Sequence, residues 1–165
     1  MSIMKLKKMP SIVDVALKEV GYIEGANNAN KYSAYFHRPP ESWCADFVNW
    51  VLAMSGQMSA ILNSPSCIAI EEWAKKQTGF IVDIKTVQAT DIVLFDFDHV
   101  GHSEHIEIAI GGIDPKTGLF PTVGGNTSND NKKAGSQSQG DCVAQKHRAP
   151  SLVRCVIRPK YRSQS

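Results

Sequence analysis

Residues 43–52 read Trp43-Cys44-Ala45-Asp46-Phe47-Val48-Asn49-Trp50-Val51-Leu52, and they follow a polar, proline-bearing loop. The change to apolar residues at helical spacing predicts a helix that is capped by Ser42, runs to about Ser55 and ends before Gly56. Cys44 then lies in the first turn, where unpaired backbone N–H groups and the positive end of the helix dipole favour a thiolate. A thiol in that position is suited to attack a carbonyl carbon, although most cysteines are simply small buried residues.

Length and composition describe an ordinary globular chain. It has 165 residues, enough for one compact domain, with 42% hydrophobic and 21% charged residues. A net charge of +2 gives no argument for nucleic acid. No apolar run approaches the roughly 18 residues of a membrane span, so we expect no membrane partner. The basic residues near the C-terminus, Arg148 among them, are typical of a solvated end, and the four cysteines suggest free thiols rather than a disulfide framework.

The N-terminus does not resemble a secretory signal. Met1–Pro10 is positively charged, but Ser11–Gly21 is interrupted by charged residues and lacks a continuous apolar core. We therefore expect a protein made for the cytoplasm, or one released by a route that reads no N-terminal signal.

Periodicity divides the chain into helices first and strands afterwards. Amphipathic helices are predicted over Ser11–Gly21 and from about Ser66 to Lys76. Asn126–Ala144, rich in small polar residues, is predicted to be an exposed, mobile loop. This order indicates an α+β domain with helices packed on an antiparallel sheet. The predicted strands are Ile92–Phe97, His105–Ile110, Leu119–Val123 and Leu152–Ile157.

A cysteine nucleophile needs a base within hydrogen-bond reach and a third group that orients the base. His105 heads a strand, which would hold its ring rigidly, whereas His99 and His102 lie in the preceding turn. Asn126 follows an apolar strand and two glycines, and its amide could fix the imidazole tautomer, although Gly-Gly-Asn is also typical of a plain turn. Glu107, on the same strand face as His105, is a rival for that role.

Several ordered blocks resemble the CHAP family (cysteine, histidine-dependent amidohydrolase/peptidase) found in bacteriophage endolysins. The segment around Cys44 is similar to the family's W-C-A-x-F-V-x-W helix, and Gly125-Asn126-Thr127-Ser128 to its G-N-T-S segment. Further similar blocks are Gly21-Tyr22-Ile23-Glu24-Gly25, Asp91-Ile92-Val93-Leu94-Phe95-Asp96, His105-Ile106-Glu107-Ile108 and Ile157-Arg158-Pro159-Lys160-Tyr161.

The resemblance implies a papain-like α+β fold and one catalytic domain over residues 1–165, with its core at about 11–161. It implies an endolysin-like peptidoglycan hydrolase in which Cys44 is the nucleophile, His105 the base and Asn126 the third residue. Trp43 and Glu107 would then contact the substrate. We expect a monomer acting on the cell wall, without nucleic acid or membrane partners, that waits in the cytoplasm until release. The chain departs from the family at Gly124, where a glutamate is common, and at Glu107, where a small residue is common.

Metal binding is not expected. Asp96, Asp98, Gly101 and Glu107 match part of a calcium-loop pattern, but Val100 stands where an oxygen ligand is required. We therefore predict no cofactor and no required metal.

Three alternatives stay open on the sequence. Cys67 also opens a predicted helix and is the second candidate nucleophile, although a structural role fits it better. The same chemistry could belong to an effector amidase delivered into rival bacteria. A catalytically silent wall-binding or virion module is the third, because Gly124 and Glu107 depart from the family.

Overall fold

The computed structural model describes residues 9–128 and 140–163. The helices and strands follow the predicted order, helices first. The helices are α1 (Ile12–Glu19), α2 (Lys31–Tyr35), α3 (Cys44–Met54) and α4 (Cys67–Lys75), with short 3-10 turns at Ala26–Asn28, Ile84–Thr86 and Pro150–Leu152. The strands are β1 (Ile81–Val82), β2 (Ile92–Phe95), β3 (His105–Ala109), β4 (Phe120–Thr127), β5 (Cys142–Arg148) and β6 (Val153–Ile157).

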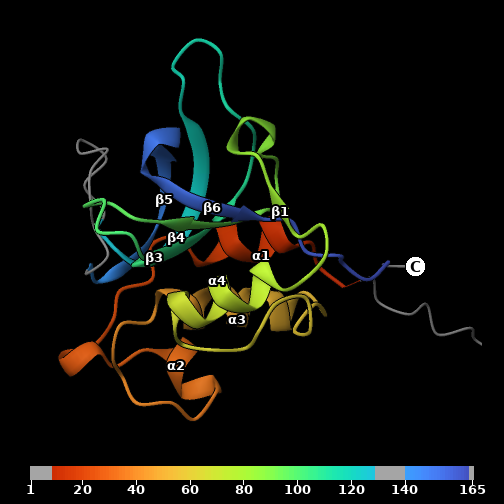
Figure 1. Cartoon of the computed structure of the whole chain (residues 1–165). Coiled ribbons are helices and arrows are strands. Elements are labelled where there is room, and N and C mark those ends of the chain that lie inside the picture. The colour runs from red at the N-terminus through yellow and green to blue at the C-terminus, as the bar shows by residue number, and fades with distance from the viewer. Residues whose placement is uncertain (1–8, 129–139, 164–165) are drawn as a thin grey trace, which may run out of the picture.

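The described strands form one six-stranded sheet in the order β1-β6-β2-β3-β4-β5, and every neighbouring pair is antiparallel. Figure 1 shows the helices gathered on one face of this sheet, with α2 farthest from it. The α+β architecture, with helices packed on an antiparallel sheet, is thus confirmed. No helix within the described ranges is both long and apolar enough to cross a membrane.

The core has two parts, one on each side of the sheet. The larger lies between α1, α3, α4 and the sheet, and it includes Phe47, Leu52, Ile106 and Ile108. The smaller lies beyond the sheet and includes Phe95 and Phe120. Because side chains alternate along β3, its isoleucines face the helices, while His105, Glu107 and Ala109 occupy the alternate positions. The strand therefore presents polar groups on the side where the phenylalanines pack.

Local side-chain caps explain the starts of α1, α2 and α4 but not that of α3. Ser11 and Ser66 accept hydrogen bonds from the backbone N–H groups of Asp14 and Ala69, both at 3.1 Å, so α1 and α4 begin as predicted. Helix α3 is different: its N-cap residue is Trp43, not Ser42, and the Trp43 side chain makes no capping bond. Tertiary packing of the Trp43 ring holds this helix start in place. Such packing leaves no local capping signal in the sequence.

The predicted loop over Asn126–Ala144 is wrong at both of its ends. Asn126 lies inside β4 and residues 142–144 begin β5, while residues 129–139 lie outside the described ranges. Strand β5 alternates between buried and exposed residues, but two of its buried residues are Lys146 and Arg148. Because these buried positions carry charged residues, β5 lacks the hydrophobic alternation by which a strand is normally identified.

The expectation of a solvated basic C-terminal region is wrong for Arg148, although Arg154, Lys160 and Arg162 are exposed as expected. Arg148 is 1% exposed. Arg158 pairs with Asp91 at 2.8 Å, and Arg154 pairs with Glu71 at 3.1 Å. These arginines tie the final strands to the rest of the sheet and to α4.

Candidate active site

Cys44 is the first residue of α3 and His105 is the first residue of β3, and the two residues lie close together. Cys44 is 4% exposed and His105 is fully buried. The Cys67 thiol lowers the pKa of Cys44 well below the ordinary thiol value, against the effect of burial, and the nearby charge of His105 lowers it further. Burial alone lowers the pKa of His105, but the neighbouring Cys44 sulfur and Glu107 carboxylate stabilise the protonated ring, outweigh burial and raise the pKa to about 9. The thiolate–imidazolium pair is therefore the favoured state between these two pKa values.

Glu107 binds the other side of the His105 ring. Its Oε2 atom lies 3.0 Å from His105 Nε2. The Nδ1 atom of His105 is buried and makes no hydrogen bond within the described part of the chain. Since Nε2 contacts Glu107, Nδ1 is the ring nitrogen left to exchange a proton with the Cys44 sulfur.

The Glu107 carboxylate is fully buried and is held from several sides. Arg148 donates from Nε to Oε1 and from a terminal nitrogen to Oε2, both at 2.7 Å, and the Thr122 hydroxyl donates to Oε1 at 2.8 Å. Burial opposes ionisation, but the charge of Arg148 holds the pKa of Glu107 well below its usual value. The guanidinium also lies 5.3 and 5.0 Å from the ring centroids of Phe95 and Phe97. Glu107 is thus a fixed negative charge beside the imidazole, with no surface on which to contact a substrate.

Gly124 and Gly125 are required by close packing rather than by a turn. The register pairs Ile108 of β3 with Val123 of β4, so the next residue on each strand, Glu107 and Gly124, also stand opposite each other. A Cβ atom at Gly124 would lie 2.3 Å from Oε2 of Glu107. One at Gly125 would lie 2.6 Å from Phe47 Cβ of α3. The glycine pair therefore admits Glu107 on one side and α3 on the other.

Asn126 follows the glycines inside β4, where the pairing between β4 and β5 shifts register. It is 1% exposed and has a φ of 52°, a left-handed conformation that asparagine tolerates better than most residues. Its backbone carbonyl accepts a hydrogen bond from the N–H of Gly140 at 2.8 Å. If the pairing of Ile108 with Val123 is continued along both strands, Asn126 stands opposite His105.

Trp43 was expected to contact the substrate, but its burial speaks against this role. Its ring is fully buried, stacks on Tyr32 with centroids 5.3 Å apart, and donates its indole N–H to Glu24. Tyr22 packs edge-on against it at 5.9 Å. Through these contacts the buried ring anchors the start of α3, next to Cys44.

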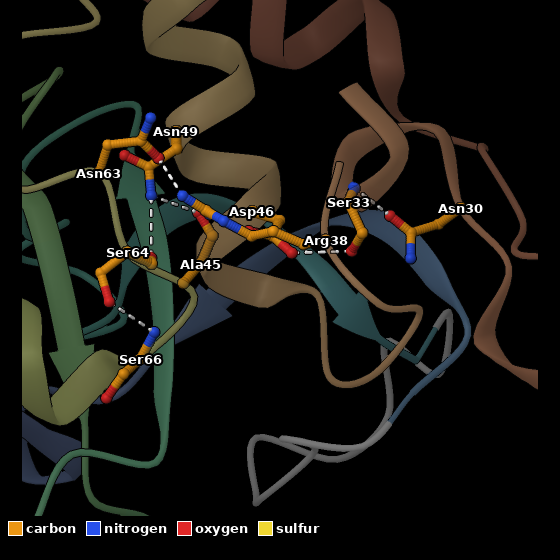
Figure 2. A network of polar contacts seen from close by, with 9 residues as sticks. All are labelled: Asn30, Ser33, Arg38, Ala45, Asp46, Asn49, Asn63, Ser64 and Ser66. Carbon is orange, nitrogen blue, oxygen red and sulfur yellow. Dashed lines mark hydrogen bonds and ion pairs between the residues drawn. The ribbon is translucent and has the colours of Figure 1, made fainter. Parts of the chain in front are cut away.

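A pocket opens beside the two helix starts that carry Cys44 and Cys67. Figure 2 shows Ser33 and Arg38 pointing toward Asp46 of α3. Ser33 donates to Asp46 at 2.7 Å, and Arg38 bridges Asp46 and Asn63. This network braces the wall of the pocket, which is lined by Arg38, Pro39, Glu41, Ser42, Asp46, Pro65 and Ser66.

The acidic residues of the hairpin after β2 do not reach the site. Asp96, Asp98 and Glu104 have carboxylate oxygens within 4.8 Å of one another. Asp96 accepts backbone hydrogen bonds from Val100 and Gly101, and Glu104 accepts them from Phe97 and Asp98. Backbone N–H groups thus bind the carboxylates of Asp96 and Glu104. Glu107, which the calcium-loop pattern had grouped with Asp96 and Asp98, belongs to the His105 site.

Two residues of the site escaped sequence reasoning. Arg148 was assigned to a solvated end, and Thr122 was not singled out. The signal that could have found Arg148 is the alternation of Ala144, Lys146 and Arg148 along β5. Cys67, which fitted a structural role better, has its sulfur 3.8 Å from that of Cys44.

Comparison with known proteins supports the fold. No protein-family model matches the sequence, and the search of curated proteins found no match. Among solved structures, the crystal structure of the wild-type endolysin LysIME-EF1 matches with a TM-score of 0.54 and 20% sequence identity. The match covers 94% of this chain and 67% of the endolysin chain. The chain therefore has a fold similar to that of an endolysin.

Proposed function

We propose that this protein is a peptidoglycan hydrolase that cleaves an amide bond of the bacterial cell wall, with Cys44 as nucleophile and His105 as acid and base. The observation that carries the proposal is the Cys44–His105–Glu107 series, in which an ionised thiol, an imidazolium and a buried carboxylate follow one another. The likeness in fold to an endolysin supports the cell wall as the substrate.

The reaction would begin with attack of the Cys44 thiolate on the amide carbon. The backbone N–H of Cys44, at the start of α3, would help to stabilise the oxyanion. His105 would protonate the leaving amine through Nδ1 and then activate a water molecule that hydrolyses the thioester. Glu107 would hold Nε2–H and stabilise the imidazolium. That Asn126 is the third residue of the mechanism stays a prediction, and the 3.0 Å contact favours Glu107 for the orienting role.

The direct test is turbidity loss of purified cell walls. We expect the wild-type protein to clear the suspension and to release new amino groups without new reducing ends. Cys44→Ala should lose the activity, whereas Cys155→Ala, which changes a half-buried thiol of β6, should keep it. Full clearing by folded Cys44→Ala would overturn the mechanism. Mass spectrometry of the released fragments would identify the bond.

The structure weakens the argument for a catalytically silent module. Gly124 and Glu107 favoured that alternative as departures from the family. Together they bring a carboxylate to His105, because the missing side chain of one makes room for the other. Wall binding with no release of amino groups would favour the silent module after all. Killing only when the protein is directed to the periplasm, with rescue by a neighbouring immunity gene, would favour an effector amidase.

A further inference from the structure

Two cysteines face each other from the starts of two helices. Cys44 is the first residue of α3 and Cys67 the first residue of α4. Their sulfur atoms lie 3.8 Å apart, and both residues are almost fully buried. Ser42 and Ser66, close to these cysteines in sequence, line the same pocket. The hydrolytic mechanism uses only one of the two sulfurs.

We propose that Cys44 and Cys67 are a redox-active pair that forms a reversible disulfide when the protein meets a hydroperoxide. The disulfide would remove the nucleophile from use and protect it from irreversible oxidation. The effect on wall hydrolysis rests on the proposed function, but formation of the bond does not.

The chemistry balances with a hydroperoxide as oxidant. The Cys44 thiolate attacks one oxygen of hydrogen peroxide, the O–O bond breaks, and the sulfur becomes a sulfenic acid as hydroxide leaves. This hydroxide takes up the proton that the Cys44 thiol had given to His105 and becomes water. The Cys67 sulfur then attacks the Cys44 sulfur, the S–S bond forms and the S–O bond breaks. The leaving hydroxyl takes up the Cys67 proton as water. Two thiols and one peroxide thus yield one disulfide and two water molecules.

The environments of the two sulfurs divide these roles between them. The pKa of Cys44 is lowered, so Cys44 supplies the reactive thiolate, whereas hydrogen bonding with Cys44 and burial raise the pKa of Cys67, which stays a thiol. Burial also raises the pKa of both Cys142 and Cys155. Cys44 is therefore the first site of oxidation, and Cys67 stands within reach to resolve it.

The test is peptide mapping after treatment with one equivalent of hydrogen peroxide. Trypsin leaves both cysteines in a single peptide, residues 32–75, because the Arg38–Pro39 bond resists cleavage. A disulfide appears as the loss of two hydrogen atoms from this peptide. Chymotrypsin cuts between the cysteines, after Phe47 and Trp50, and should yield two cross-linked fragments that separate with dithiothreitol.

Variants provide the controls. In Cys67→Ala and the closer isostere Cys67→Ser, we expect oxygen to add to Cys44 instead, and wall hydrolysis to become progressively unrecoverable by dithiothreitol. Cys155→Ala should still form the disulfide. Oxygen addition at Cys44 of the wild-type protein, with residues 32–75 never losing two hydrogens, would overturn the proposal. The mapping needs no activity assay, so it stands even if the protein proves not to cleave cell walls.

Discussion

A Cβ atom on Gly124 would lie 2.3 Å from the Oε2 atom of Glu107, so a side chain at this position of β4 would collide with the Glu107 carboxylate. In the family that the sequence resembles, the glutamate is common at the position of Gly124 and a small residue at that of Glu107. The two positions are coupled in this structure, because the missing side chain of Gly124 leaves room for the Glu107 carboxylate, which contacts His105.

The first prediction tests this close packing by filling the space at Gly124. Gly124→Ala should lower the free energy of unfolding by about 1–3 kcal/mol, because the added methyl group overlaps the Glu107 carboxylate. Urea unfolding followed by circular dichroism measures the loss. Gly25→Ala is the matched control, since its Cβ would meet only ordinary contacts at 3.5 Å.

Moving the carboxylate from position 107 of β3 to the facing position 124 of β4 should also give a functional site. The double variant Glu107→Gly with Gly124→Glu is expected to hydrolyse walls faster than either single variant. If the double variant is no more active than the worse single one, the two positions are not interchangeable.

The second prediction concerns the alkaline limit of activity. The proposed mechanism needs a protonated His105, so the rate should fall as pH rises through its pKa of about 9. Glu107→Gln removes the negative charge that stabilises the imidazolium, which lowers the pKa of His105 and moves this limit to lower pH. The rate of turbidity loss against pH measures the shift. Glu72→Gln, on the exposed side of α4, should leave the limit unchanged.

The third prediction concerns the acidic limit. The Cys44 thiolate is lost as pH falls through the thiol pKa, which the Cys67 hydrogen bond lowers. Cys67→Ala should therefore raise the pKa of Cys44 and move the acidic limit to higher pH. The rate of alkylation by iodoacetamide against pH follows the thiolate directly. An unchanged alkylation profile would show that Cys67 does not influence the nucleophile, and Cys155→Ala is the control.

The fourth prediction concerns stability. Arg148→Met leaves the Glu107 carboxylate buried without its main countercharge, which should cost about 3–5 kcal/mol of unfolding free energy. Adding Glu107→Gln should recover part of this loss, because the unpaired charge is then gone. Urea unfolding of the single and double variants measures the coupling. Arg162→Met changes an exposed residue and should stay within about 0.5 kcal/mol of the wild-type protein.

The same ion pair sets an acid sensitivity. The folded pKa of Glu107 lies below its ordinary value, so its stabilising contribution is complete above the unfolded pKa of about 4.5 and is lost as pH falls below it. The wild-type protein should therefore lose stability over this acidic range. A double variant with Arg148→Met and Glu107→Gln should lose less of its own stability over that range.

Local sequence rules predicted the elements whose signals are local. Ser11 and Ser66 cap their helices through their own side chains, and apolar runs formed β2 and β3. These rules failed where partners are distant in the chain. Strand β5 brings Arg148 to Glu107, 41 residues away in sequence, and the position of the α3 start depends on an aromatic cluster around Trp43.

The sequence by itself determined the helices and most of the strands, the α+β class, and the positions of Cys44 and His105 at the starts of a helix and a strand. Helical and strand periodicities are set by neighbouring residues, and they can be read without knowing the fold. Only the tertiary structure decided that Glu107 contacts His105, that Gly124 makes room for it, and that Cys67 faces Cys44. Those relationships depend on strand register and on the packing of α3 against α4, and both arise from contacts between segments far apart in the chain.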